Sequence, residues 1–220
     1  MTTVLIVEDH QVVSAGLALG LRSEGYETVS VDGSPAGVAA ALEEHDPEIV
    51  LLDLYLAGDA LGTDLIPLLD PDARKIIVLT AASDPLLLGA ALEAGAHDVL
   101  PKTAPFARVL AGVEAALAGG SADVENRRQD ILREARSARR AAERRLAPFT
   151  DLTPREQQVL GMLMDGLQAS AIAEASYVSL ATVRSQIRSI LTKLGVSSQL
   201  SAVSMAIQAG WTPDSGPSGS

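Results

Sequence analysis

The stretch Ile49-Val50-Leu51-Leu52-Asp53 decides the fold of this chain, because four consecutive apolar residues lead directly into a carboxylate. Three other short runs also end in polar residues: Val4–Val7 before Glu8 and Asp9, Lys75–Leu79 before Thr80, and Asp98–Pro101 before Lys102. Such continuous apolar runs are typical of strands buried on both faces of a parallel sheet. Ligands bind beyond the carboxyl ends of these strands. We therefore expect three carboxylates, a hydroxyl and an ammonium to meet at one sheet edge.

The acidic cluster of Glu8, Asp9 and Asp53 indicates a cation site. Clustered carboxylates repel one another unless a cation joins them. Mg²⁺ suits this position, since it takes one or two carboxylates, keeps several waters and accepts a phosphate oxygen. The alternative is that each acid caps a helix at a strand-to-loop junction. Capping explains one acid well but not the whole set, so the pattern favours magnesium and phosphate binding.

The first 120 residues alternate between predicted strands and helices, which indicates an α/β doubly wound (βα)5 domain over 1–120. We expect strands near 3–8, 27–31, 48–53, 75–80 and 97–100, and helices near 11–23, 36–44, 62–69, 86–94 and 105–118. Pro35 and Pro105 suit the first turns of helices. Gly25 and Gly95 suit the ends of helices.

Residues 121–149 are expected to form a helical linker that is rich in Arg, Ala and Glu and ends before Pro148. Its apolar residues form a thin stripe in which seven-residue spacing recurs: Val124, Ile131 and Ala138, with Ala135 and Ala142 between. One interpretation is a solvated, charged helix. The other is a two-stranded coiled coil that pairs two subunits. Both remain open from the sequence.

Residues 150–211 are expected to form an all-α domain of four helices. The first begins at Thr153-Pro154-Arg155-Glu156, which combines a capping residue, a proline and an acid in the first turn. The others are predicted near 170–176, 180–194 and 199–209. The short turn 176–179 gives a helix-turn-helix arrangement. Residues 212–220 are expected to form a flexible tail.

Two groups of motifs resemble known families. Similarity to the receiver domain of two-component response regulators lies in Val4 to His10, Asp53–Gly58, Thr80-Ala81-Ala82 and Leu100-Pro101-Lys102. Similarity to the LuxR-type helix-turn-helix lies in Leu152–Leu160 and Thr182–Val196. Their order in one chain resembles the NarL/FixJ class, over residues 3–120 and 150–211.

The resemblance implies a role for each polar residue of the first domain. Asp53 would accept a phosphoryl group from a sensor histidine kinase. Mg²⁺ would bind Asp9 and Asp53 directly, with the backbone carbonyl of Tyr55 as a further ligand and Glu8 acting through water. Two residues would sense the phosphoryl group: Lys102 by pairing with it and Thr80 by donating its hydroxyl.

Two residues depart from the receiver pattern. Val99 stands at the switch position, three residues before the lysine, where the family usually has an aromatic residue. The rotating aromatic side chain of the usual switch is therefore absent. Ala57 stands where a proline is often found, which is expected to alter only the loop.

A hydrolase is the main alternative of another class. Phosphatases with an aspartyl nucleophile need a second acid two residues later to protonate the leaving group. That position holds Tyr55. We therefore expect no enzyme beyond the protein's own phosphorylation and dephosphorylation.

The predicted helix 180–194 has the chemistry of a DNA-contacting surface. Arg184 and Arg188 share a face, and Arg and Gln side chains can bond guanine and adenine edges. The resemblance places Arg184, Ser185 and Arg188 at base-contacting positions, Gln186 at the position of a common histidine, and Lys193 at a phosphate contact. Thr182 completes the expected DNA-binding set. The alternative is an amphipathic helix with solvated charges.

The net charge of −11 belongs to the first domain. Residues 1–120 carry 5 basic and 18 acidic side chains, or −13, whereas 121–149 carry +3 and 150–220 carry −1. Phosphate contacts supply most non-specific DNA affinity, so one copy of the last domain is expected to bind weakly. A homodimer contacting two half-sites is therefore expected.

The absence of cysteine excludes disulfides and thiolate metal sites. His10, His45 and His97 lack the spacing of a zinc site. No apolar run has the length of a membrane span, and no signal-peptide pattern opens the chain, so a cytoplasmic protein without membrane partners is expected.

The sequence thus predicts a DNA-binding transcriptional response regulator with Mg²⁺ as cofactor. Phosphorylation would change its dimerisation or domain arrangement. Its expected partners are double-stranded DNA, a histidine kinase, a second copy and RNA polymerase. The alternative is a constitutive dimer that binds DNA through pairing of 121–147, largely independent of phosphorylation.

Overall fold

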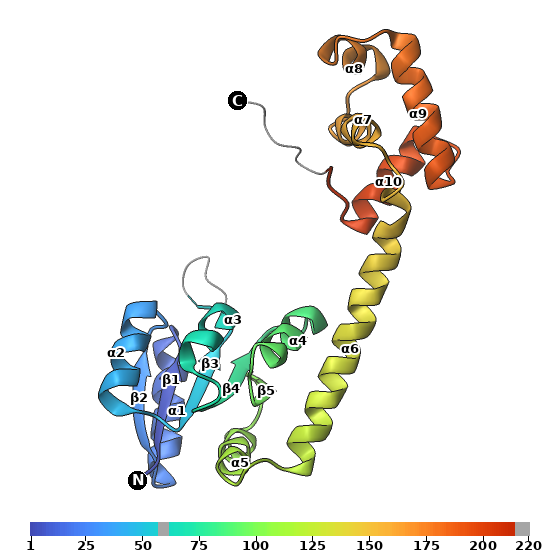
Figure 1. The fold of residues 1–220 in the computed structure, drawn as a ribbon. Helices are drawn as coiled ribbons and strands as arrows, with labels where there is room; N and C mark the ends of the chain where they lie inside the picture. Colours follow the sequence, from blue (N-terminus) through green and yellow to red (C-terminus); the bar gives the residue numbers. More distant parts are fainter. Residues whose placement is uncertain (57–61, 214–220) are drawn as a thin grey trace. The chain divides into compact units, whose positions relative to one another are not determined.

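The computed structural model describes residues 1–56 and 62–213 of the 220-residue chain (Figure 1). It divides into two compact units, 1–138 and 139–220, and the division lies inside helix α6 (Ala122–Leu146). The expectations for Ala57 and for the tail from 214 onward lie outside the described residues. The boundaries at 120 and 150 stay predictions.

The first unit contains a five-stranded parallel sheet in the order β2-β1-β3-β4-β5. Its strands are β1 (Thr3–Val7), β2 (Glu27–Val31), β3 (Ile49–Asp53), β4 (Lys75–Thr80) and β5 (Asp98–Pro101). Its helices are α1 (Gln11–Ser23), α2 (Pro35–His45), α3 (Gly62–Leu65), α4 (Pro85–Glu93) and α5 (Phe106–Leu117), with a 3-10 helix, η1 (Ile66–Leu69). The prediction of a doubly wound α/β domain is confirmed.

Strands β1, β3 and β4 are buried on both faces, as their apolar runs predict, whereas the edge strand β2 is only half-buried. In β1, Val4 and Ile6 pack in one core cluster with residues of α1 and α5. Leu5 and Val7 pack in another with residues of α2, α3 and α4. The parallel register aligns the strand ends, with Asp53 opposite Leu79 of β4. This alignment brings the polar residues that end the strands to one edge.

Two local details differ from the predictions. The helix expected at 62–69 is α-helical only to Leu65 and continues as the 3-10 helix η1, which contains Pro67 near its start. Proline lacks the N–H that an α-helical bond would need there. Pro105 precedes α5 as its capping residue instead of lying in the first turn.

The second unit contains the four predicted helices: α7 (Pro154–Met164), α8 (Ala169–Ala175), α9 (Leu180–Leu194) and α10 (Gln199–Ala209). A 3-10 helix, η2 (Ala147–Phe149), precedes them, and Phe149 stacks on Trp211 with ring centroids 5.3 Å apart. No single described helix is long and apolar enough to cross a membrane; α9 and α10 satisfy length and composition only as a pair bent by 56°.

A buried carboxylate joins α7 to α9. Glu156 accepts from the Thr153 backbone N–H at 2.8 Å and from the Ser189 hydroxyl at 2.6 Å. Lys193 Nζ lies 2.7 Å from Oε2, the oxygen that also accepts from Thr153, whereas Ser189 bonds Oε1. Burial alone would raise the pKa of Glu156, but the bonds from Lys193, Ser189 and Thr153 outweigh it and lower the pKa from 4.5 to about 2.

We predict that the Glu156 network stabilises the second unit above pH 4.5. Because its folded-state pKa is lowered, this stability is lost as the pH falls from 4.5 towards 2, by on the order of 2–3 kcal/mol. Glu156→Gln should lose about 1–3 kcal/mol at pH 7. Urea unfolding followed by fluorescence of Trp211, the single tryptophan, measures this unit alone.

The exposed Glu174 provides the matched control, since Glu174→Gln removes the same charge from a solvated position. Equal unfolding midpoints for Glu156→Gln and Glu174→Gln at pH 7 would contradict the prediction.

Candidate functional site

The acidic cluster forms at the carboxyl edge of the sheet. Glu8 and Asp9 directly follow β1, and Asp53 ends β3. Glu8, Asp9, His10 and Asp53 each offer a ligand atom, and these atoms lie within 4.8 Å of one another. Asp53 is only 2% exposed and Glu8 6%. The predicted meeting of the three carboxylates at one edge is therefore observed.

Lys102 supplies the positive charge of the cluster. Its Nζ lies 2.7 Å from Asp53 Oδ2 and 2.6 Å from Glu8 Oε2. Burial alone would lower the pKa of the Lys102 ammonium, but its bonds to Asp53 and Glu8 outweigh burial and raise the pKa. Lys102 directly follows β5, whose pairing with β4 carries it to this edge.

One oxygen of Asp53 is left without a partner. Asp53 Oδ1 is buried and makes no hydrogen bond within the described part of the chain, whereas Oδ2 is paired with Lys102. An unsatisfied buried carboxylate oxygen is unfavourable unless another group binds it. A hard cation that prefers oxygen ligands fits this donor set, which contains three carboxylates and one ammonium.

The close approach of α3 supports the backbone of Asp53. Gly62 donates its N–H to the carbonyl of Leu54 at 2.8 Å. A Cβ atom at Gly62 would collide with the Asp53 carbonyl oxygen, so only glycine fits here. The sequence analysis did not single out Gly62, because the contact depends on how α3 returns to β3.

The predicted switch residues lie beside the cluster on β4 and β5. Thr80 is 1% exposed, and its Oγ1 accepts from the Ala82 N–H at 3.0 Å. Val99 is 4% exposed and belongs to a core cluster against which Ile131 and Leu132 of α6 pack. The switch position is thus close-packed with apolar residues and carries no aromatic ring.

His10 is a residue of the site that the sequence analysis did not assign. Its Nδ1 lies 3.0 Å from Glu8 Oε1 and 2.8 Å from Asp9 Oδ1. The hydrogen bond that Glu8 accepts from the ring, followed by the charge of Asp9, raises the pKa of His10. Its position directly after Asp9 was the available signal, but a search for zinc spacing does not detect it.

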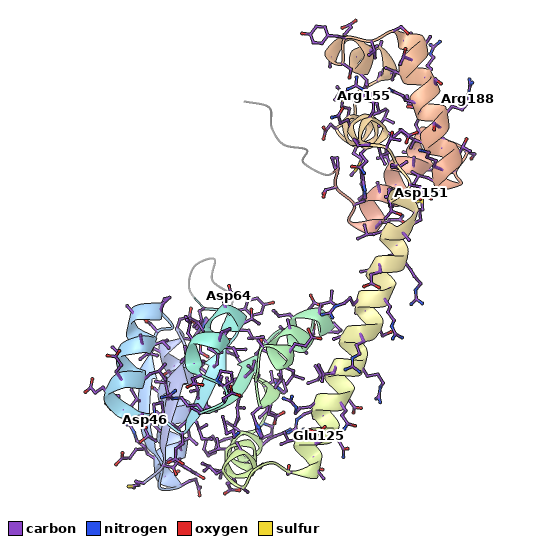
Figure 2. All side chains as sticks on the ribbon, in the orientation of Figure 1. Asp46, Asp64, Glu125, Asp151, Arg155 and Arg188 are labelled. Carbon is purple, nitrogen blue, oxygen red and sulfur yellow. The ribbon has the colours of Figure 1, made fainter. Side chains whose placement is uncertain are left out.

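Helix α9 presents the predicted DNA-contacting side chains on one surface. Thr182, Arg184, Ser185 and Arg188 are exposed, and Arg188 projects outward from α9 in Figure 2. The opposite stripe is buried in the core and contains Val183, Ile187, Ile190 and Leu194. Ser179 caps α9 by accepting from the Thr182 N–H, and Gly195 ends it with a φ of 67°.

Two of the predicted DNA-contacting residues, Gln186 and Lys193, are not simply exposed and free of contacts within the domain. Gln186 is half-buried, unlike its exposed neighbours. Lys193 Nζ donates to the Asp151 carbonyl at 3.0 Å, besides its bond to Glu156. Lys193 therefore stabilises the domain whether or not it also contacts a phosphate.

Both halves of the chain match described families. Residues 4–114 match the response regulator receiver domain, and residues 150–206 match the luxR family of bacterial regulatory proteins. The transcriptional regulatory protein YdfI of Bacillus subtilis is 33% identical over 215 residues, covering 96% of this chain and 97% of that protein. The nitrate/nitrite response regulator protein NarP of Escherichia coli is 33% identical over 208 residues, covering 93% and 94%.

A solved structure of the RcsB response regulator of Salmonella typhimurium has a TM-score of 0.52 at 23% identity. The match covers 94% of this chain and 98% of that chain. At this identity the likeness supports the fold.

We predict that Lys102→Met destabilises the first unit by about 3–5 kcal/mol, because it leaves two buried carboxylates without their cation. Adding Asp53→Asn should restore part of the loss by removing one of those charges. Urea unfolding followed by circular dichroism in EDTA measures both variants, with Trp211 fluorescence identifying the transition of the second unit. An unchanged midpoint for Lys102→Met would show that the ammonium does not offset the carboxylates.

Proposed function

This chain belongs to the response regulators that join a receiver domain to a luxR-family DNA-binding domain, and we propose that phosphorylation of Asp53 controls its binding to DNA. Family membership makes it a DNA-binding transcriptional regulator and not a classical enzyme. The observation that carries the proposal is the buried Asp53 carboxylate, which has one oxygen paired with Lys102 and one that no described residue hydrogen-bonds.

Asp53 acts as the nucleophile. Its oxygen forms a bond with phosphorus as the bond from phosphorus to the donor breaks, so a carboxylate becomes an acyl phosphate. Lys102 first holds Asp53 in place and then pairs with the transferred phosphoryl group. Thr80 already accepts from Ala82, so its own hydroxyl proton remains free to be donated to the phosphoryl oxygens.

Mg²⁺ is the proposed cofactor. Asp9 and Asp53 would hold it directly, the carbonyl of Tyr55 would add a ligand, and Glu8 would act through water. Bound Mg²⁺ neutralises charge on the transferred phosphoryl group. The unpaired Asp53 oxygen and the close spacing of the acidic cluster support this assignment.

The exposed face of α9 is the proposed DNA surface. Arg184, Ser185 and Arg188 contact base edges, and Thr182 and Gln186 lie beside them. Their exposure supports this assignment, except at the half-buried Gln186. Lys193 would contact a phosphate only by sharing or leaving its bonds to Glu156 and Asp151.

The proposed partners follow from the two domains. A sensor histidine kinase in the cytoplasm supplies the phosphoryl group, and RNA polymerase is the expected target of the regulator. Because the last domain carries a charge of only −1, two copies are needed for tight binding to two half-sites. A constitutive coiled coil of α6 is less favoured, since Val124 and Ala135 of its predicted seam pack within the first unit.

We predict that Asp53→Asn abolishes acyl-phosphate formation. The parent protein, incubated with acetyl phosphate and Mg²⁺ and weighed by mass spectrometry, should gain one phosphoryl group. Asp64→Asn is the matched control, because it removes a carboxylate of the same unit from α3, outside the acidic cluster (Figure 2). A phosphoryl adduct on Asp53→Asn would contradict the assignment.

Mg²⁺ is predicted to raise the melting temperature of the first unit, because it offsets repulsion within the acidic cluster and binds only the folded state. Asp9→Ala should remove this effect, whereas Asp64→Ala should keep it. Calorimetry of the full chain with and without Mg²⁺ measures the shift. An unchanged melting temperature of the parent protein at millimolar Mg²⁺ would show that the cluster does not bind it.

Arg184→Ala is predicted to weaken binding to a preferred DNA sequence by about 1–3 kcal/mol and to relax sequence preference, if its guanidinium bonds a guanine. Arg155→Ala serves as a control on α7, since that side chain bonds Gln158 and the Ser176 carbonyl. Fluorescence anisotropy with matched and mismatched duplexes at one salt concentration separates the two variants. Equal losses on both duplexes would contradict base contact by Arg184.

A further inference from the structure

The first part of α6 packs against the receiver as an integral element. We name residues 122–138 the docked segment, since they belong to the first unit. Val124 is 3% exposed and Ala135 1%, although most of this helix is polar. Ile131 and Leu132 pack against the core cluster that contains Val99. Figure 1 shows this part of α6 beside α4 and β5.

A partly buried ion pair fixes the docked segment to β5. Arg127 donates from Nε to Asp98 Oδ1 at 3.0 Å and from Nη2 to Oδ2 at 2.6 Å. Asp98 is fully buried and is the first residue of β5. A two-pronged bond of this kind fixes orientation as well as distance. Arg128 adds bonds from Nη1 to the carbonyl oxygens of Ala96 and His97.

A close backbone contact fixes the docked segment to α4. Gly89 of α4 is buried, and a Cβ atom added there would overlap the Cβ of Ala135. The two helices therefore approach each other more closely than a side chain at residue 89 allows. This contact offers a conservative means of displacing α6, because a single methyl group is enough to disturb it.

Both elements that hold the docked segment adjoin the phosphorylation site. Strand β5 runs from Asp98, which bonds Arg127, to the residue before Lys102. Helix α4 follows Thr80 after a four-residue connection. A movement of Thr80 or Lys102 towards a phosphoryl group would therefore displace α4 or β5, the two elements that α6 contacts. Val99, at the switch position, has no ring that could relay the change.

Resting on the proposed function, we propose that the docked segment is an intramolecular latch: it packs on α4 and β5 while Asp53 is unphosphorylated and is released when Asp53 is phosphorylated. Val124, Ile131 and Ala135 belong to the stripe that also forms the predicted coiled-coil seam. One face cannot pack on the receiver and on a second helix at the same time. Docking therefore competes with pairing of two copies, and release frees the stripe for the α6 of a second copy.

A single introduced cysteine tests the latch in the full chain, which has no natural cysteine. Val124→Cys places a thiol on the buried face, and Ser137→Cys places one on the exposed face of the same helix. Maleimide labelling is followed by mass spectrometry with and without acetyl phosphate and Mg²⁺. The thiol at 124 should react slowly at first and about tenfold faster after phosphorylation, while the thiol at 137 should react at one rate throughout.

Steric variants supply the second arm of the experiment. Gly89→Ala should speed labelling at position 124 without any phosphodonor, because its methyl group overlaps Ala135. Adding Ala135→Gly to Gly89→Ala should slow the labelling again, since the substitution removes the methyl group of residue 135 that the new methyl group at residue 89 overlaps. Adding Asp53→Asn to Val124→Cys should abolish the response to acetyl phosphate.

The same spectra separate the two hypotheses. A phosphoryl adduct with unchanged labelling at position 124 would overturn the latch and leave the proposed function standing. No adduct on the otherwise unchanged chain would contradict both. Fast labelling at position 124 before phosphorylation, in a chain whose melting is unaltered, would show that the segment is not docked.

Discussion

The repulsion among three carboxylates at one sheet edge is the constraint on which the first unit depends. The parallel register places Glu8, Asp9 and Asp53 there together, and Lys102 offsets part of their charge by bonding two of them. The bond to Lys102 leaves one Asp53 oxygen without a hydrogen bond among the described residues. That oxygen is therefore available to bind another group. A site with excess negative charge favours a metal ion, and the proposed Mg²⁺ would offset the charge of an approaching phosphoryl group.

The elements that enclose this site also hold the linker helix. Lys102 is attached to β5, whose other end bonds Arg127, and Thr80 is attached to the connection into α4, which contacts α6 at Gly89. The same two elements therefore hold the proposed phosphorylation site and the docked segment. α4 and β5 therefore connect the acidic cluster to the docked segment. This connection does not require an aromatic side chain at position 99, where this chain has Val99. Beyond the docked segment, α6 leads into the second unit, where α9 carries the exposed arginines.

Patterns along the sequence predict the elements well, because their causes are local. The apolar runs before Glu8, Asp53 and Thr80 identify strands buried on both faces, and the segment from Thr153 to Glu156 identifies the start of α7. What the sequence does not predict depends on tertiary contact. The stripe on α6 is visible, but its partner is not, since Arg127 and Asp98 are 29 residues apart and meet only when α6 docks. Likewise, the bond of Lys193 to Glu156 spans 37 residues, so the resemblance that implies a phosphate contact for Lys193 does not reveal this partner.

In the proposed function, the chemical state of Asp53 in the first unit determines DNA binding by the second unit. The most direct test is the Kd of the full chain for a duplex selected from random-sequence DNA by the phosphorylated protein. It is measured at one salt concentration with and without acetyl phosphate and Mg²⁺, alongside Asp53→Asn. We predict that phosphorylation lowers the Kd of the parent protein about tenfold or more and leaves that of Asp53→Asn unchanged. Equal Kd values for the phosphorylated and unphosphorylated parent protein would contradict the account.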